Sequence, residues 1–313
     1  MAETLPGEMV QGGSLESAGT TAAGVPSRAE LGFFAINLDR STQRWAKIAQ
    51  SFAGLPWPLY RVAALDAAQN PEAVLAARGQ ALVLPPSGIG WNPLRHRLFS
   101  LVEEACFASH MLALRTFLAS GHEYAVILED DAMPLEGLDE ALRRLLASNV
   151  AFDIVKLEGT ARGKGRLAVI VTDLGTVRLV RSFQPSSGSA GYVVTRPAAA
   201  RMIDKAGRLM VPVDDYVSNP GLHGCDIMHL SPWLICQTND DTTMGRQRGP
   251  NRHVKRRDPF HFLAQGLRRG GLRLQLWWKA ARGLPLSPFR LRIAPWRPEG
   301  FSHSAQRRLA GAS

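Results

Sequence analysis

Three consecutive carboxylates, Glu129, Asp130 and Asp131, directly follow the apolar run 124–128. Burial and mutual repulsion oppose their ionisation, so a positive charge is expected beside them. Alternation along an extended chain places Glu129 and Asp131 on one side and Asp130 on the other. The pair that shares a side can therefore present oxygens to one hard cation, Mn²⁺ or Mg²⁺, which as a Lewis acid stabilises charge on a departing diphosphate. The competing interpretation is an acidic loop that caps the next helix.

A second acidic pair, Asp214 and Asp215, lies between two short strand-like segments, 211–213 and 216–217. Carboxylates are among the side chains that take a proton from an attacking hydroxyl group. An Asp pair that follows a proline also suits the N-terminus of a helix, where it caps backbone N–H groups. Both interpretations stay open on the residues alone.

Polar side chains also follow the first two apolar runs of the chain. Asn37, Arg40 and Arg44 come at the end of the first run and just after it. Arg offers a forked donor that suits phosphate, so these residues are candidates for binding a nucleotide, and surface ion pairs are the alternative. Asp66 ends the second run, where it either accepts a hydrogen bond from a base or ribose or serves as a turn residue.

Further polar residues have weaker signals. Ser109 and His110 share a helix and can contact a metal or a substrate, although a lone helical His is more often packed and hydrogen-bonded. Lys156 either meets a phosphate or is a solvated residue at a strand end. One looser group fits no metal-site template: His223, Asp226 and His229.

The elements that must position these side chains alternate between strands and helices from the first apolar run onward. The apolar pattern predicts strands at 33–38, 59–65, 124–128, 152–157, 176–181 and 190–195, and helices at 43–52, 103–119, 136–148 and 198–206. Strand–helix–strand order predicts an α/β fold with a central, mostly parallel sheet flanked by helices. Proline and glycine interrupt residues 84–96, where a long loop is expected.

Composition is that of an ordinary globular protein: 313 residues, 45% hydrophobic and 20% charged, enough for one large domain or two small ones. The three cysteines, Cys106, Cys225 and Cys236, form no CxxC pair and no closed disulfide framework, which favours a reducing compartment. The first 30 residues lack the pattern of a secretory signal, and no run reaches the roughly 18 apolar residues of a membrane span. A cytoplasmic protein, attached to a surface if at all, is expected.

The net charge of +10 is concentrated near the C-terminal end. From Gly245 onward there are 16 Lys and Arg residues but only Asp258 and Glu299, which leaves 21 basic and 25 acidic residues in the rest. A mildly acidic body with a basic tail indicates a catalytic domain with an attachment arm. Because Trp277, Trp278 and other apolar residues interleave with the basic ones, the tail is expected to lie on an anionic membrane surface. Nucleic acid is the less favoured partner, and packing against the body is a further alternative.

Taken together, these segments resemble glycosyltransferase family 25, the group of lipooligosaccharide galactosyltransferases and collagen galactosyltransferases. The matching stretches occur in the family's order between residue 33 and about 243. They are Ile36-Asn37-Leu38-Asp39-Arg40-Ser41 with Arg44, Ala64-Leu65-Asp66-Ala67, Glu103 with Cys106 and Ser109-His110, Ile127-Leu128-Glu129-Asp130-Asp131, Lys156-Leu157, Gly191-Tyr192-Val193-Val194-Thr195-Arg196, and Pro212-Val213-Asp214-Asp215-Tyr216.

The resemblance implies a GT-A-like fold of the nucleotide-diphospho-sugar transferases. It implies a UDP-sugar donor, with UDP-galactose expected, a Mn²⁺ (or Mg²⁺) cofactor, and inversion at the anomeric carbon without a covalent intermediate. The implied acceptor is a lipid-linked oligosaccharide of the lipooligosaccharide or lipopolysaccharide type. On the matched motifs, Asp131 and Glu129 are expected to hold the metal, and Asp214 or Asp215 to act as the base. The donor nucleotide and its phosphates are assigned to Asn37, Arg40, Arg44, Asp66, Glu129 and Asp130.

The chain departs from the family's pattern at three positions. Val102 and Ala105 stand where the family usually has glycine, and Ala67 ends a motif that usually ends in glycine. Glycine permits close approach of the backbone to a ligand, so a tighter pocket is expected. The alternative functions are a catalytically silent relative that binds nucleotide or glycan and, less favoured, a nucleic-acid-binding protein that uses the tail.

Three parts are expected along the chain: a disordered lead-in over 1–30, a catalytic domain over 31–245 and a basic, aromatic-rich tail over 246–313. Since the expected acceptor is a membrane lipid, attachment through the tail would raise the rate of encounter. The expected location is the cytoplasmic face of the inner membrane, as a peripheral protein.

Overall fold

The computed structural model describes residues 30–79, 91–92, 97–159, 166–183, 186–206, 211–238, 267, 270–275, 277–278 and 293–296. The expected lead-in, apart from residue 30, lies outside the described residues. So do most of the loop expected at 84–96 and most of the tail expected at 246–313.

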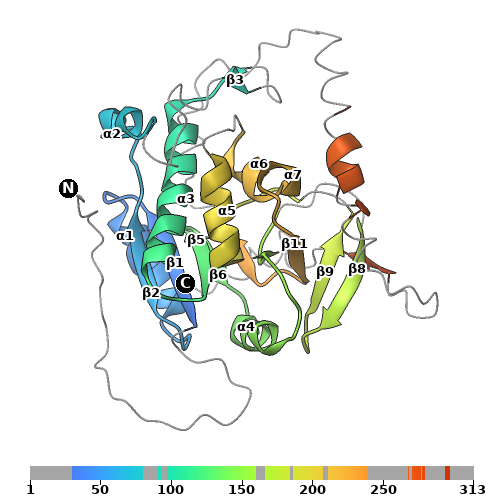
Figure 1. Cartoon of the computed structure of the whole chain (residues 1–313). Coiled ribbons are helices and arrows are strands. Elements are labelled where there is room, and N and C mark those ends of the chain that lie inside the picture. Colours follow the sequence, from blue (N-terminus) through green and yellow to red (C-terminus); the bar gives the residue numbers. More distant parts are fainter. Residues whose placement is uncertain are drawn as a thin grey trace.

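A central sheet organises the described part of the chain (Figure 1). Its nine strands are β1 Leu31–Asn37, β2 Leu59–Ala63, β5 Tyr124–Glu129, β7 Ile154–Lys156, β8 Arg166–Asp173, β9 Arg178–Ser182, β10 Gly191–Thr195, β11 Ile227–Ser231 and β13 Ile293–Trp296. Their order is β13-β8-β9-β11-β7-β10-β5-β1-β2. The pairs β1–β2, β1–β5 and β7–β11 are parallel and the others antiparallel, so the sheet is mixed. Strands β1, β2, β5, β7 and β11 nevertheless run in one direction, so their carboxyl ends share one edge.

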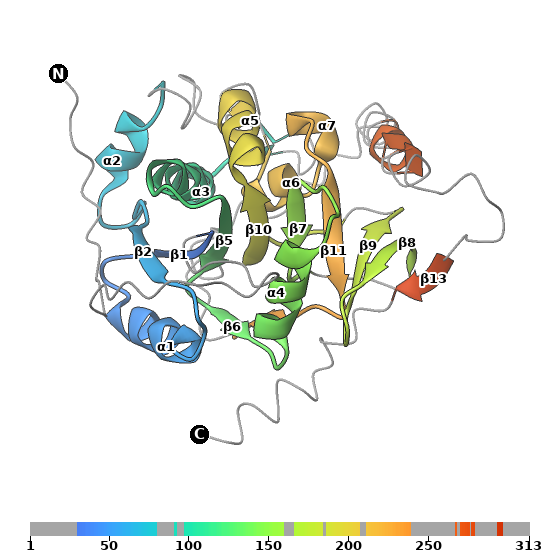
Figure 2. The ribbon, with the colours of Figure 1, turned by 60° about the horizontal axis from the view of Figure 1, so that its bottom comes forward.

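Helices cover both faces of this sheet (Figure 2). They are α1 Thr42–Phe52, α2 Pro71–Ala76, α3 Leu101–Ala119, α4 Leu138–Ala147, α5 Arg196–Ala206, α6 Val213–Val217 and α7 Pro220–His223. Helices α2, α3, α5, α6 and α7 lie on one face, and α1 and α4 on the other. Short strand pairs accompany them: β3 Trp91–Asn92 with β4 Arg97–Leu98, and β6 Ala132–Pro134 with β12 Ile235–Gln237. The α/β fold with a central sheet flanked by helices is confirmed.

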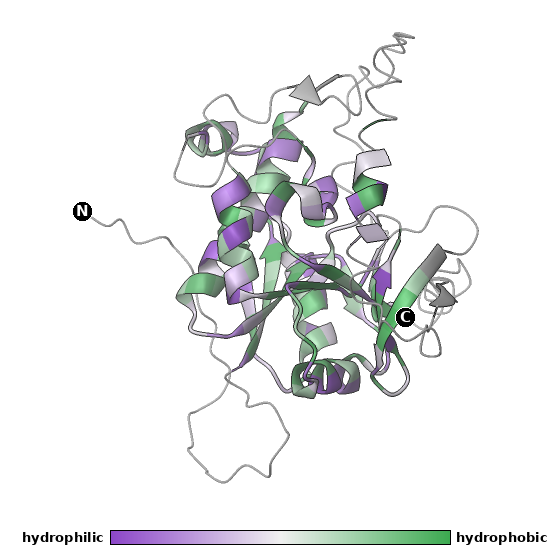
Figure 3. Cartoon of the chain, turned by 45° about the vertical axis from the view of Figure 1, so that its right-hand side comes forward, coloured by the Kyte–Doolittle hydropathy of each residue, from purple (hydrophilic) through white to green (hydrophobic). Residues whose placement is uncertain are grey.

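Strand alternation divides most of the core into two large hydrophobic clusters, and a small third cluster forms around Trp233. In β1, Phe34 and Ile36 pack under α3 and α5, whereas Phe33 and Ala35 pack against α1 and α4 on the other face. The strands are therefore apolar along most of their length, as the hydropathy colouring shows (Figure 3). Helices α1 and α4 are amphipathic, whereas α3 is apolar on most of its surface. This burial on both faces explains why the strands read as continuous apolar runs in the sequence.

Helix α3 is the longest helix in the described part of the chain, and it spans one face of the sheet beside α5. A capping box starts it: the Ser100 side chain accepts from the backbone N–H of Glu103, and the Glu103 carboxylate accepts from the backbone N–H of Ser100. Ala105 is buried in this helix, and Ala67 packs against the same cluster, so these two departures from the family's glycines lie at packing positions.

The structure corrects one expected element. The segments 211–213 and 216–217 are not strand-like, because Val213–Val217 forms helix α6 with Pro212 at its N-cap. Val213, Tyr216 and Val217 are buried at helical spacing, and the two aspartates occupy the first turn, where the helix dipole favours negative charge. Asp214 and Asp215 thus lie at a helix N-terminus, although the N-cap position itself is held by Pro212.

Other differences concern elements that the sequence pattern does not predict: α2, α7, β3, β4, β6, β8, β11, β12 and β13. Helix α4 begins at Leu138 rather than at 136, because Gly137 at its N-cap has a φ of +87°, a left-handed conformation that favours glycine. No helix in the described ranges is long and apolar enough to cross a bilayer.

Candidate active site

The predicted site residues gather at the edge of the sheet where the strands that share a direction end. Asn37 ends β1, Asp66 follows β2, Glu129 ends β5 and Lys156 ends β7. Strand β10 runs against its neighbours β5 and β7, so the residues just before it, such as Ser189, lie at this edge too. In open α/β sheets this edge carries the ligand crevice.

Asp130 is held by the first strand–helix unit. Asn37 donates its amide to Oδ2 of Asp130 over 2.9 Å, and Arg44 forms an ion pair with Oδ1 at 2.8 Å. Arg61, which the sequence reasoning missed, donates to Oδ1 of Asn37 and pairs with Asp39. The sequence feature that could have identified Arg61 is a basic residue inside an otherwise uncharged strand. Arg44 thus supplies the positive charge that the carboxylate cluster was expected to need.

Arg40 and Asp66 contact each other rather than standing apart. Nε of Arg40 lies 2.5 Å from Oδ2 of Asp66, while Oδ1 of Asp66 accepts the backbone N–H groups of Ala68 and Gln69. Burial opposes ionisation of Asp66, but the bonds from Arg40 and from the backbone outweigh it and lower the pKa of this carboxyl. Asp66 therefore stabilises the turn that follows it, and a phosphate that reaches Arg40 meets a guanidinium already paired with a carboxylate.

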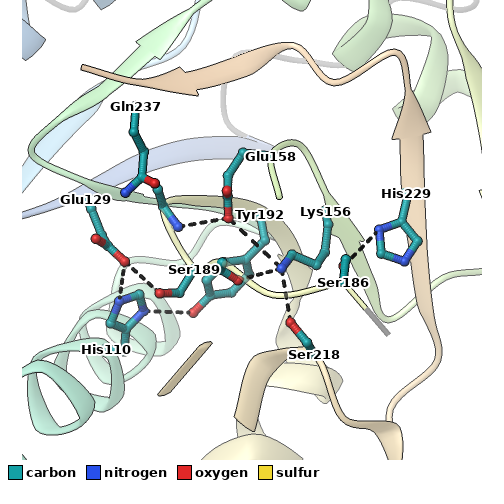
Figure 4. Close-up of polar contacts among 12 residues, drawn as sticks. His110, Glu129, Lys156, Glu158, Ser186, Ser189, Tyr192, Ser218, His229 and Gln237 are labelled. Atoms are coloured by element: carbon teal, nitrogen blue, oxygen red, sulfur yellow. Dashed lines mark hydrogen bonds and ion pairs between the residues drawn. The ribbon is translucent and has the colours of Figure 1, made fainter. Parts of the chain in front are cut away.

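Glu129 points toward a different set of partners, drawn in Figure 4. Ser189 donates its hydroxyl to Oε1 of Glu129 over 2.6 Å, and Nε2 of His110 lies 3.5 Å from the same oxygen. Nδ1 of His110 lies 3.3 Å from the hydroxyl of Tyr192. Burial favours the neutral form of Glu129, but His110, Ser189 and the charge of Lys156 together lower its pKa. His110 is thus a buried, packed residue that contacts the carboxylate cluster.

Asp131 differs from its two neighbours because, among the described residues, no Arg, Lys or His forms an ion pair with it, whereas Asp130 pairs with Arg44 and Glu129 with His110. Nε2 of Gln237 lies 3.4 Å from its Oδ1. Burial, followed by the negative charges of Glu129 and Asp130, raises the pKa of Asp131 to about 7. Asp131 is the member of the triplet whose ionised form most lacks a countercharge.

A divalent cation at Asp131 would supply that countercharge, so the residues present fit such an ion. In the part of the chain that the structure describes, no group of three or more His, Cys, Asp or Glu residues is arranged to hold a metal. A cation here would therefore complete its shell with diphosphate oxygens and water, the habit of Mg²⁺-type ions at phosphate sites. Glu129, the second expected ligand, has Ser189 and His110 as partners, which makes Asp131 the better donor.

Carboxylates of both acidic clusters act electrostatically on Cys106 of α3. Burial, followed by the negative charges of Glu129, Asp214, Glu103 and Asp131, raises the pKa of the Cys106 thiol well above its usual value. Cys106 therefore lies within electrostatic reach of both the triplet after β5 and the first turn of α6. Asp215 occupies the same helical turn and is half-buried.

Lys156 is fully buried, so the interpretation as a solvated strand-end residue is wrong. Its ammonium group donates to the backbone oxygen of Gly188 and, over 3.0 Å, to Oγ of Ser218, and lies 4.0 Å from Oε1 of Glu158 (Figure 4). Glu158 is also fully buried and was missed by sequence reasoning, although a carboxylate so soon after a buried strand is a readable signal. Ser109 donates to Ala105 and accepts the backbone N–H of Leu65, a structural role.

Comparison with known proteins identifies a family and two relatives. The sequence profile of glycosyltransferase family 25, described as LPS biosynthesis protein, matches residues 31–217. The lacto-N-neotetraose biosynthesis glycosyltransferase LgtB of Neisseria meningitidis serogroup B is 27% identical over 222 residues, 65% of this chain and 71% of that protein. The LgtB of Neisseria gonorrhoeae is 28% identical over 215 residues, 64% of this chain and 72% of that protein.

Among solved structures, A197 from STIV covers 64% of this chain and 83% of its own, with 14% identity and a TM-score of 0.32. Mannose-1-phosphate geranyltransferase from Thermus thermophilus covers 64% of this chain and 73% of its own, with 12% identity and the same TM-score of 0.32. TM-scores this low support no conclusion about function. Because the family's profile spans more than half of the chain, including both acidic clusters, this protein belongs to glycosyltransferase family 25 and is an enzyme of the glycosyltransferase class.

Proposed function

We propose that the enzyme transfers galactose from UDP-galactose, with inversion at the anomeric carbon, to a lipooligosaccharide or lipopolysaccharide acceptor. The family's description as LPS biosynthesis protein and the names of the two LgtB relatives support this acceptor class. The observation that carries the proposal is that carboxylates at the end of β5 and in α6 both act electrostatically on Cys106 of α3, while Arg44, which follows β1, pairs with Asp130.

The first cluster serves the leaving group. Asp131, assisted by Glu129, would hold Mn²⁺ or Mg²⁺, which supplies Lewis-acid stabilisation of the diphosphate when bound. Arg44 and Asn37 orient Asp130 so that its charge is fixed beside Asp131. In the same proposal, Arg40 and Asp66 contact the nucleotide of the donor.

The second cluster serves the acceptor. The acceptor's hydroxyl oxygen attacks the anomeric carbon from the side opposite the diphosphate, and the bond to the diphosphate oxygen breaks with its electron pair leaving on UDP. A carboxylate of α6 takes the hydroxyl proton as general base. Asp214 is the favoured base, since its charge influences Cys106, Lys156 and Glu158 at the sheet edge. Asp215 is the alternative in the same turn.

The tail serves membrane attachment in this proposal, on the cytoplasmic face of the inner membrane. Four apolar side chains of its described part, Leu267, Leu274, Trp277 and Trp278, each expose between 55% and 70% of their surface. Leu274 and Trp277, together with Arg273, also line an open hollow of about 370 Å³ beside Phe183. Exposed Trp and Leu next to Arg suit the headgroup region of an anionic leaflet.

The test is a screen of sugar nucleotides against a lipid-linked oligosaccharide acceptor, with the product read by mass. The expected product gains one hexose from UDP-galactose, and free UDP appears only with a divalent cation. Binding of UDP without any transfer to any acceptor would instead favour the catalytically silent relative.

A further inference from the structure

The two acidic clusters are connected by one buried cation. Lys156 ends β7 with no exposed surface, and its ammonium group donates hydrogen bonds to Gly188 and Ser218 and forms an ion pair with Glu158. Burying an ammonium group costs free energy that even good partners often only offset, and an apolar side chain of similar volume is often as stable. Stability alone therefore does not explain why a lysine occupies this buried position or why it contacts these three residues.

One set of hydrogen bonds connects Lys156 to the acidic cluster after β5. Lys156 holds the backbone oxygen of Gly188, and the next residue, Ser189, donates its hydroxyl to Glu129. Ala190 donates its N–H to Glu158 over 3.0 Å, and its oxygen accepts the N–H of Glu129 over 3.1 Å. Residues 188–190 are thus tied at three consecutive positions.

This segment has little freedom to move. Gly188 has a φ of +109°, and a Cβ built there would lie 2.6 Å from the carboxylate oxygens of Glu158. The Lys156–Glu158 pair therefore packs directly under the segment that orients Glu129.

A second hydrogen bond connects Lys156 to α6. Ser218 is the C-cap residue of the helix that carries Asp214 in its first turn, and its Oγ accepts a hydrogen bond from Lys156 over 3.0 Å. Among the anions near Lys156, Glu158, Asp214 and Glu129 all favour its charged form against the opposing effect of burial, which lowers its pKa. Lys156 is therefore within electrostatic reach of both clusters as well as bonded to the elements that carry them.

We propose that Lys156 is a positioning residue for transfer, fixing the α6 carboxylate relative to Glu129 and its neighbours through Gly188 and Ser218. It contacts no substrate in this account. The inference rests on the proposed function, in which one cluster binds the donor and the other activates the acceptor.

The experiment compares Lys156→Met with the double variant Lys156→Met/Glu158→Gln and with Ser218→Ala. In the single variant, kcat is expected to fall about a hundred-fold, the scale associated with small misplacement of reacting groups, while the affinity for UDP with Mn²⁺ changes about threefold or less. The acidic limb of the kcat/KM pH profile is expected to move to higher pH, because the base loses a nearby positive charge.

The double variant separates positioning from mere stability. Removing both buried charges restores the melting temperature if Lys156 only balances Glu158. The proposal expects kcat to stay low in the double variant even where stability returns, and Ser218→Ala to lower kcat several-fold with unchanged UDP binding. Recovery of kcat together with stability overturns it.

Lys205→Met on α5, where the side chain pairs with Asp204 at the surface, is the matched control and is expected to keep wild-type kcat. If Lys156→Met does not fold, the double variant and Ser218→Ala decide the question by the same readouts. Wild-type protein that binds no UDP and transfers no sugar refutes the proposed function itself, which is a separate outcome.

Discussion

The three carboxylates after β5 are adjacent in sequence but are satisfied in different ways. Asp130 is neutralised by Arg44, and Glu129 is bonded by Ser189 and contacted by His110. The carboxylate of Asp131 meets the neutral amide of Gln237 and, within the described chain, no basic ion-pair partner. Adjacent acids of similar type therefore have separate roles, set by what the neighbouring elements bring to each.

The role of Asp131 is tested by Asp131→Asn. Because a bound cation contributes several kcal/mol of transition-state stabilisation, kcat is expected to fall about a hundred-fold or more while the far-UV spectrum and melting temperature are kept. Asp139→Asn on α4, a surface residue paired with Arg143, is the control and is expected to retain activity. Unchanged turnover in Asp131→Asn would refute the metal role.

Glu158 predicts a pH dependence of stability. Burial, with the nearby charge of Glu129, raises the pKa of Glu158 to about 7 from its usual 4.5, although Lys156 opposes the shift. The folded state thus holds a proton that the unfolded state releases, so this contribution to stability is full below about pH 4.5 and is lost as pH rises toward 7.

The free energy of unfolding of the wild type, relative to Glu158→Gln, is expected to decrease between pH 5 and pH 7.5 by at most about 3 kcal/mol. Chemical denaturation at both pH values measures the free energy of unfolding of each protein. Taking the difference between the two proteins removes the pH-dependent contributions of titratable groups that behave alike in both. A difference that stays constant with pH contradicts the assignment.

At the level of elements, α6 places two half-buried aspartates in one turn. Asp214→Asn is expected to lower kcat about a hundred-fold or more, the usual scale for loss of a general base, without weakening UDP binding. Asp215→Asn is expected to lower kcat less than about tenfold. Steady-state kinetics with both variants decides between them, and a larger loss in Asp215→Asn reverses the assignment.

Helix α3 carries His110 and Cys106 to the sheet edge, and its capping box fixes where it begins. Ser100→Ala removes the side-chain acceptor for the N–H of Glu103 and is expected to cost about 1 kcal/mol of stability. For a domain of this size the melting temperature should fall by about 2–4 °C. Ser51→Ala is the control: this hydroxyl donates to the backbone of its own helix at Lys47, lies 3.2 Å from the sulfur of Met133 and caps no helix N-terminus. An equal effect of the two variants contradicts the capping role.

The elements that pattern alone predicts well are the buried strands β1, β5 and β10 and the long helix α3, whose apolar runs are continuous or strongly marked. Helix α6 was mistaken for strand-like segments, because five residues hold too little periodicity to separate the two states. The site shows the same limit. Spacing identifies the carboxylates, but the pairing of Arg40 with Asp66 and the burial of Lys156 depend on contacts between elements distant in sequence.

At the level of the whole molecule, the tail is part of the fold as well as a candidate membrane contact. Strand β13 pairs with β8, so deleting everything after residue 250 would remove a strand of the central sheet. Substitution is the cleaner test: Trp277→Ser with Trp278→Ser is expected to lower binding to phosphatidylglycerol vesicles several-fold.

Turnover on a lipid-linked acceptor is expected to fall with vesicle binding, whereas turnover on a soluble acceptor stays within about twofold, since neither Trp is placed at the active site. Leu75→Ser, an exposed apolar residue on α2, is the control. Vesicle flotation measures the binding. Equal binding of the Trp variant and the wild type contradicts the attachment role, and stronger binding to DNA than to vesicles favours a nucleic-acid partner.

The central claim is that acidic side chains at the carboxyl edge of the sheet recruit a divalent cation together with the diphosphate of a sugar nucleotide. Titration of UDP into the purified protein by calorimetry tests it most directly. The account predicts binding in Mn²⁺ that becomes at least about tenfold weaker in a chelator and in Asp131→Asn, because the cation links carboxylate to phosphate. UDP affinity that is the same with and without the cation, or no binding in either condition, would contradict it.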